Sequence, residues 1–190
     1  MLFKIILSGH LEFGTDRTFE LVMNMFQQRA ETYYKNDILL KPVDIFIAEQ
    51  NMLDVPRLIV PTATEKSWRN TVHLLDTISQ YAIAGNIGAW KLDNGSLVEH
   101  AFLEPKGDMT AVQSYLRGRE LLILGQQTEA RDALSAAIEK FTRHALAYER
   151  RGYVNYKLGN INDALYDFTK SIDIYPHSPE AYMGRAIVRL

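Results

Sequence analysis

Two polar side chains near the amino terminus have the types and spacing for acid–base chemistry. His10 and Glu12 lie two residues apart in an apolar segment that predicts a first β-strand, so both would project from one face of the sheet, where His100 could join them. A histidine beside a carboxylate is a common acid–base pair. No nucleophile or oxyanion site is recognisable near them. We therefore predict no catalytic residues and keep an enzymatic first domain as an alternative.

Three other patterns have better structural than chemical explanations. Gly85 and Gly88 match part of a phosphate loop, but they precede an expected strand rather than a helix. Asn94, Gly95 and Ser96 form a glycosylation pattern, but Asn-Gly between two apolar runs predicts a type I′ hairpin turn. The five histidines never fall at i, i+4 or in a carboxylate-rich cluster. We expect neither a metal site nor a cofactor.

Composition excludes several classes of protein. The chain has 190 residues, of which 47% are hydrophobic, and a formal charge of −2, so it can bury a core and is not a globally basic nucleic-acid binder. It contains no cysteine, which excludes disulfides, thiol nucleophiles and cysteine-ligated metals. No window approaches the ~20 apolar residues of a membrane span, and the apolar amino terminus is interrupted too early for a signal peptide. We expect a cytoplasmic protein that binds neither nucleic acid nor membrane.

The second half of the chain repeats with a period of 34 residues. Residues of the same kind coincide at this offset: Gly118 with Gly152, Gly125 with Gly159, Ala130 with Ala164, Leu124 with Leu158, and Ile138 with Ile172. Glycine inside a helix costs about 1 kcal/mol against alanine, so Gly118 and Gly152 indicate close approach of a neighbouring helix. Gly125 and Gly159 suit the ends of first helices. This pattern predicts five helices over residues 110–190, arranged as two antiparallel pairs and one further helix.

These residues resemble the tetratricopeptide repeat (TPR) family. Residues that fit its pattern are Tyr148, Gly152, Ala164, Phe168 and Pro176 in residues 145–178, and Gly118, Leu121, Ala130, Leu134 and Ala137 in residues 111–144. Arg151 and Asn155 stand where the family usually has Leu and Tyr. Ser114 and Thr142 replace an expected aromatic residue and proline, so the first repeat is degenerate. The resemblance implies a TPR-type array of about two and a half repeats that binds a protein or peptide.

The third repeat, residues 179–190, contains a single helix. Its apolar stripe is left uncovered by any following helix and consists of Tyr182, Met183, Ala186, Ile187 and Leu190. Solenoid repeats need a polar terminal cap. We expect either that the chain is part of a longer protein, which is the interpretation we prefer, or that the stripe docks on another molecule, including by self-association.

In the TPR family the first helix of each pair lines the concave surface. Carrying those positions over gives a partner-binding groove of Tyr115, Arg119, Glu149, Tyr153, Tyr156, Met183 and Ile187. Family members that bind chaperone tails have Lys and Asn side chains there to clamp a terminal carboxylate. This chain has aromatic residues, one Arg, one Glu and two apolar residues instead, so we predict that it does not bind acidic chaperone tails.

Residues 1–108 show no such period and differ in charge, with 10 Lys and Arg against 14 Asp and Glu, whereas residues 109–190 have 11 against 9. Helices are expected after caps at Thr15 or Asp16 and at Thr64 or Ser67. Strands are expected at 43–48 and 58–60, bounded by Pro42, Pro56 and Pro61, and in a hairpin of 83–93 with 96–104 that pairs Leu92 with Leu97 and Trp90 with Glu99. The predicted fold is an α+β domain, a sheet with two helices in the order β-α-β-β-α-β-β, followed by the all-α array at 109–190.

The leading hypothesis is an interaction module, or scaffold, that binds a protein or peptide partner through the groove of the repeats. The alternative is a small enzyme or ligand-sensing domain in residues 1–108 whose target the repeats recruit. A deep pocket in the first domain, lined by converging polar groups, favours the alternative.

Overall fold

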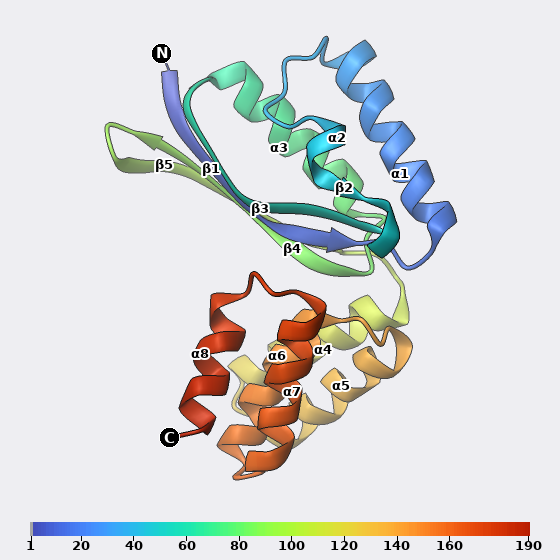
Figure 1. The fold of residues 1–190 in the computed structure, drawn as a ribbon, viewed down its shortest axis with the longest axis vertical. Helices are drawn as coiled ribbons and strands as arrows, with labels where there is room; N and C mark the ends of the chain where they lie inside the picture. Colours follow the sequence, from blue (N-terminus) through green and yellow to red (C-terminus); the bar gives the residue numbers. More distant parts are fainter. Residues whose placement is uncertain (1) are drawn as a thin grey trace. The chain divides into compact units, whose positions relative to one another are not determined.

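The computed structural model describes residues 2–190, which form two compact units that meet between residues 106 and 107 of the chain (Figure 1). None of the helices in residues 2–190 combines the length and apolar composition needed to cross a membrane.

The first unit contains a five-stranded antiparallel sheet in the order β2-β3-β1-β4-β5. Its strands are β1 (Leu2–Glu12), β2 (Phe46–Ile47), β3 (Met52–Thr64), β4 (Ala84–Asp93) and β5 (Ser96–Leu103). Its helices are α1 (Asp16–Gln28), a π-helix η1 (Arg29–Tyr33), α2 (Pro42–Ile45), a 3-10 helix η2 (Ala48–Gln50) and α3 (Glu65–Ser79). The structure has the expected α+β architecture, and its order of strands and long helices matches the expected one, with the short helices η1, α2 and η2 added between α1 and β3.

The long helices α1 and α3 cover one face of the sheet (Figure 1). Alternate residues of β1 project toward them, because successive strand side chains point to opposite faces. The core between sheet and helices includes Ile5 and Leu7 from β1, Phe26 from α1 and Trp68 from α3, all of them fully buried. The apolar side of each helix, expected from its sequence periodicity, thus faces the sheet.

Local signals place the ends of these helices. The Thr15 hydroxyl accepts a hydrogen bond from the Thr18 N–H at 3.1 Å and caps α1. Thr64 and Ser67 cap α3 reciprocally, since the side chain of each bonds the backbone N–H of the other. Of the two candidate capping residues expected for each helix, the threonine is the N-cap in both α1 and α3.

The structure corrects the expected strands around the prolines. The segment predicted as a strand at 43–48 is mostly the short helix α2, which begins at Pro42, where proline suits a first helical turn. Pro56 and Pro61 lie inside β3, not at its limits. Strand β2 pairs with β3 only at Met52 and Leu53, so the prolines occupy a stretch of β3 that β2 does not cover.

The hairpin of β4 and β5 has the predicted turn, with Asn94 and Gly95 at φ of 48° and 85°. Leu92 pairs with Leu97 as expected, but Trp90 pairs with His100 rather than Glu99. The register shifts by one residue between Lys91 and Leu92. Every pair farther from the turn than Leu92 and Leu97 is therefore displaced by one residue.

The second unit consists of five helices: α4 (Thr110–Ile123), α5 (Gln127–Lys140), α6 (Ala145–Lys157), α7 (Ile161–Ile174) and α8 (Pro179–Val188). Helices α5 and α7 begin and end 34 residues apart. The turns between paired helices contain Gly125 and Gly159 at φ of 74° and 79°, a backbone conformation that favours glycine. The five predicted helices and both predicted turns are confirmed.

Glycines also permit the expected close approach of helices. A Cβ at Gly118 would lie 2.7 Å from Cγ of Leu134, and one at Gly152 would lie 3.2 Å from the Phe168 ring. Phe168 also touches α8, where a Cβ at Gly184 would lie 2.3 Å from its ring. Phe168 of α7 is therefore wedged between α6 and α8.

Candidate functional site

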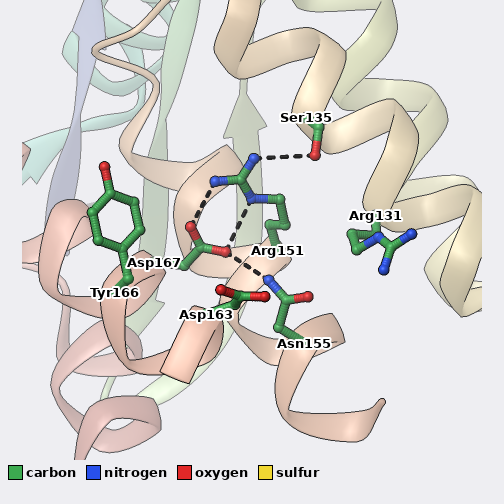
Figure 2. Close-up of a pocket in the computed structure, with 7 residues that line it drawn as sticks. All are labelled: Arg131, Ser135, Arg151, Asn155, Asp163, Tyr166 and Asp167. Carbon is green, nitrogen blue, oxygen red and sulfur yellow. Dashed lines mark hydrogen bonds and ion pairs between the residues drawn. The ribbon is translucent and has the colours of Figure 1, made fainter. Parts of the chain in front are cut away.

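A polar cavity of about 420 Å³ opens among helices α5, α6 and α7 (Figure 2). The side chains that line it are Arg131 and Ser135 from α5, Arg151 and Asn155 from α6, and Asp163, Tyr166 and Asp167 from α7. It lies where neighbouring repeats meet.

Arg151 occupies the centre of this cavity and joins the three helices. Its Nε and Nη2 donate to Oδ2 and Oδ1 of Asp167 at 3.0 and 2.7 Å, and its Nη1 donates to Oγ of Ser135 at 3.0 Å. Nδ2 of Asn155 also donates to Oδ2 of Asp167, at 2.9 Å. Figure 2 shows this network, in which a bidentate ion pair fixes both partners.

Burial makes the geometry of this ion pair important. Asp167 is 1% exposed, and the side chain of Arg151 is 19% exposed. Burial lowers the pKa of Arg151, but the hydrogen bonds and the charge of Asp167 outweigh it and leave that pKa above its ordinary value. Arg151 therefore stays charged beside the Asp167 carboxylate.

The wall of the cavity contains two cations and two anions, since Arg131 and Asp163 accompany the central pair. A wall with balanced charge favours hydrogen-bonding polar groups over ions of either sign. The ring of Tyr166, 54% exposed, adds an aromatic surface. The cavity is thus suited to polar contacts, while Arg151 itself is already engaged by protein groups.

Sequence reasoning did not identify this cluster as a site. The available signal was the replacement of the usual Leu and Tyr by Arg151 and Asn155, which places polar atoms at positions that face a neighbouring helix. A buried arginine requires an acceptor. Asp167, sixteen residues further on, supplies it from α7.

Two of the seven predicted groove residues are buried inside the helical unit. Tyr115 is 6% exposed, and its ring centre lies 4.7 Å from that of His144. Burial raises the pKa of Tyr115, and the nearby charges of Arg150 and Arg119 oppose that shift. Glu149 is 7% exposed and accepts a hydrogen bond from Oγ of Ser178 at 2.7 Å. Both residues are therefore components of the packed interior.

The other five predicted groove residues lie on the first helices of the repeats. Tyr153, Tyr156, Met183 and Ile187 are exposed, and Arg119 is half-buried. Helix α6, which carries the two tyrosines, packs against both α4 and α8. Arg119, Tyr153 and Ile187 occupy equivalent positions, 34 residues apart.

Helix α6 thus carries the polar network on one side and exposed tyrosines on the other. Arg151 is two residues from Tyr153, which is a rotation of about 200° around the helix axis. The side with Arg151 faces α5 and α7, whereas Tyr153 is 48% exposed. The buried network and the exposed tyrosines are therefore separate features of one helix.

In the first unit the structure brings together only part of the expected acid–base group. Nε2 of His10 and Oε1 of Glu12 lie 3.6 Å apart, and both side chains are buried. His100 is elsewhere, because it pairs with Trp90 on β4 whereas His10 pairs with Asn86. Four residues of β4 separate those positions, about 13 Å along the strand.

A second cavity, of about 430 Å³, lies in the first unit and is lined by Tyr33, Tyr34, Lys66, Arg69, Asn70 and His73. The hydroxyl of Tyr34 is 2.7 Å from Nδ1 of His73. Burial raises the pKa of Tyr34, so its hydroxyl stays protonated in neutral solution. The lining of this cavity includes two cations and no carboxylate. In residues 2–190, no group of three or more His, Asp or Glu side chains is placed to hold a metal ion.

Comparison with known proteins gives structural neighbours only. No protein-family model matches the chain, and neither does any curated protein. The TPR2B domain of yeast Sti1, solved as a complex with pHsp70, is 26% identical with a TM-score of 0.42, and the match covers 43% of this chain and 66% of that one. An Arabidopsis OM64 TPR domain is 15% identical with a TM-score of 0.41, and the match covers 90% of this chain and 97% of that one. The chain thus spans just under two thirds of the Sti1 chain.

Proposed function

We propose that the helical unit binds a protein or peptide partner through α4, α6 and α8, which are the first helices of its three repeats. The observation that carries this proposal is the set of exposed side chains at equivalent repeat positions, namely Tyr153 at 48% and Ile187 at 44%, with Met183 at 61% one turn before Ile187. Large exposed side chains that recur on packed neighbouring helices form a continuous contact surface. We call this surface, formed by Arg119, Tyr153, Tyr156, Met183 and Ile187, the repeat face.

The chemistry of the repeat face favours an apolar or aromatic segment that contains a polar anchor. Tyrosine rings supply rigid contact area at low conformational cost, and their hydroxyls remain able to hydrogen-bond. Arg119 suits a carboxylate or a backbone carbonyl. The Sti1 domain is described with pHsp70. None of the five repeat-face residues is Lys or Asn, and the neighbouring Lys157 places its Nζ over the Tyr153 ring, 5.4 Å from the ring centre. We therefore propose a partner other than an acidic chaperone tail.

The test uses the full chain to capture its partner from the native cell. Tyr153→Ala combined with Met183→Ala should abolish capture of the proteins that the unaltered chain retains. Tyr81→Ala is the control, since Tyr81 is a tyrosine of similar exposure in the first unit and lies outside both the repeat face and the cavity of Arg151. Equal capture by all three proteins, with folding verified by circular dichroism, would refute the proposal.

A titration tests the excluded partner separately. An acidic chaperone-tail peptide should show no saturable binding to the full chain. Binding in the low-micromolar range that disappears in Arg119→Ala would overturn this part of the proposal, because it would assign the carboxylate clamp to Arg119.

The cavity with Tyr33 and Arg69 favours a second candidate function, a ligand-binding first unit. Tyr33 is 70% exposed and packs edge-on against Tyr34, with ring centres 4.8 Å apart, so its ring is available to stack on a planar group. Lys66 and Arg69 are one helical turn apart on α3. They form solvent-exposed ion pairs with Asp37 and Glu65, at 3.0 and 3.7 Å, and an anionic group would bind in competition with these carboxylates. We propose a small anionic aromatic molecule as the ligand class.

Phenyl phosphate is a suitable probe for this candidate. Saturable binding observed by NMR should weaken in Arg69→Gln and remain in Arg17→Gln, an exposed arginine on α1. Inorganic phosphate should bind more weakly, because it lacks the ring. Equal weakening by both substitutions would refute a site at this cavity.

A further inference from the structure

Strand β5 is an edge of the sheet and pairs only with β4. An edge strand presents unpaired backbone N–H and C=O groups that can pair with another strand. Several large apolar side chains of β5 are exposed, with Leu97 at 61%, Val98 at 53% and Phe102 at 46%. The strand therefore combines an open backbone with apolar side chains.

The opposite edge of the same sheet is protected, whereas β5 is not. Strand β3 contains Pro56 and Pro61, which cannot donate backbone hydrogen bonds, and β2 covers its first two residues. Strand β5 contains neither proline nor lysine. Its carboxylate, Glu99, forms an ion pair with Lys91 within the sheet. Proline and a covering strand are thus present on one side only, while β5 carries the register irregularity between Leu97 and Glu99.

We propose that a second copy of this chain pairs with β5 in antiparallel orientation, joining the two sheets edge to edge. Such a pair has a two-fold axis perpendicular to the sheet, because that operation reverses the strand while keeping each face on its own side. Residues on one face of β5 then pair with residues on the same face of its copy. The axis must therefore lie midway between one residue of β5 and the same residue of the second copy.

The side chains of β5 select the register of this pair. An axis at His100 places Val98 opposite Phe102, so two exposed apolar side chains meet. An axis at Glu99 places two carboxylates directly opposite each other, which is destabilising. An axis at Ala101 places the Glu99 carboxylate opposite Leu103.

The self-complementary register is the reason to assign β5 to a second copy. With the axis at His100, Val98 and Phe102 meet twice, on the two sides of the axis, and the two His100 rings face each other beside Trp90. The one carboxylate of β5, Glu99, faces a small side chain, Ala101, in this arrangement. An unrelated strand would need to match the same alternation, whereas a second copy supplies it by symmetry.

The absence of cysteine in the chain allows a direct test by disulfide formation. His100→Cys places one cysteine on the axis, opposite its copy, at a separation that a disulfide can bridge. In Val98→Cys alone, the two cysteines lie four residues apart, about 14 Å, which is too far for a disulfide. A mixture of Val98→Cys and Phe102→Cys proteins brings the two different cysteines together.

The expected result under mild oxidation is a covalent dimer for His100→Cys and for the mixture, at rates at least about tenfold above either Val98→Cys or Phe102→Cys alone. Met183→Cys is the control for self-association through α8, where Met183 is 61% exposed. Faster cross-linking of Met183→Cys than of His100→Cys would overturn the proposal. Equal rates for all β5 variants would overturn it as well, because they would reflect random collisions.

Sedimentation velocity provides a second test that uses no cysteine. The unaltered chain should associate reversibly, and Val98→Lys should lower the association constant at least about tenfold by placing a charge in the apolar pair. Ile59→Lys, on β3, changes a residue of similar exposure and should leave association unchanged. A monomer at all concentrations, or equal effects of both lysines, would overturn the proposal. Loss of partner capture by the repeat-face variants would leave this result unaffected.

Discussion

The buried ion pair of Arg151 and Asp167 allows a quantitative prediction about the helical unit. The Asp167 carboxylate accepts two hydrogen bonds from Arg151 and one from Asn155, and it is 1% exposed. Asp167→Ala removes both acceptor oxygens, and with them all three hydrogen bonds, and leaves a partly buried guanidinium without its counter-ion. Breaking one partner of a buried ion pair costs about 3–5 kcal/mol, and we expect about 3 kcal/mol because Arg151 retains some solvent contact.

The double variant separates the role of the charges from that of the packing. Arg151→Leu introduces the residue that is usual at this position in TPR sequences and leaves Asp167 as the uncompensated charge. Arg151→Leu combined with Asp167→Ala removes both charges, so the double variant should be less destabilised than the sum of the single variants by at least about 2 kcal/mol.

The assay is urea unfolding followed by far-ultraviolet circular dichroism on the full chain. Both tryptophans, Trp68 and Trp90, belong to the first unit, so their fluorescence records that unit separately. Asp163→Ala is the matched control, because Asp163 is an exposed carboxylate of the same cavity and should cost below about 1 kcal/mol. Additive single variants, or a cost for Asp167→Ala equal to that for Asp163→Ala, would refute the assignment of Arg151 and Asp167 as a coupled buried pair.

Three further predictions concern stability. Gly152→Leu should destabilise the protein by about 2 kcal/mol or more through overpacking against Phe168, and an unchanged melting temperature would contradict the close contact. The hydrogen bond from Lys91 lowers the pKa of Glu99, so its contribution is present above the unfolded pKa near 4.3 and is lost as the pH falls through the lower folded value. Since Glu99 is half-exposed, Glu99→Gln should flatten the pH dependence of unfolding below about pH 5 by no more than about 1 kcal/mol, and an unaltered acid limb would count against the ion pair. Thr64→Ala should cost about 1 kcal/mol by removing the cap of α3, as measured by urea unfolding, whereas a neutral effect would show that the cap is dispensable.

The helical repeat was predictable because its signals are local and recur. Gly125 and Gly159 each determine a turn through a backbone conformation that other residues rarely adopt, and their separation of 34 residues sets the period. The Asn94-Gly95 turn was predictable for the same reason. In each case the residue type alone restricts the backbone, so no knowledge of distant contacts was needed.

The errors arose where a distant contact decides the outcome. Trp90 pairs with His100 because of an irregularity in the hairpin, and the residues of the turn do not predict this irregularity. Pro56 lies inside β3, since only the tertiary arrangement leaves its side of the strand uncovered. Family positions placed Glu149 in the groove, but Ser178, 29 residues away, holds it in the interior. Sequence spacing determines which helix a residue belongs to but not which partner it meets.

The polar network and the repeat face are related through the rigidity of α6. A bidentate Arg–Asp pair restricts both distance and orientation, unlike a contact between apolar side chains, which tolerates sliding. Arg151 makes such contacts with α7 and a further hydrogen bond with α5, so α6 is fixed to a helix of its own repeat and to one of the preceding repeat. Tyr153, on the other side of α6, is thereby held in position before a partner arrives. For the partner binding that we propose, less ordering of the surface would then be needed, which would raise affinity without any added contact. The departure of this chain from the usual Leu at Arg151 thus provides a physical route by which a buried substitution supports binding at an exposed face.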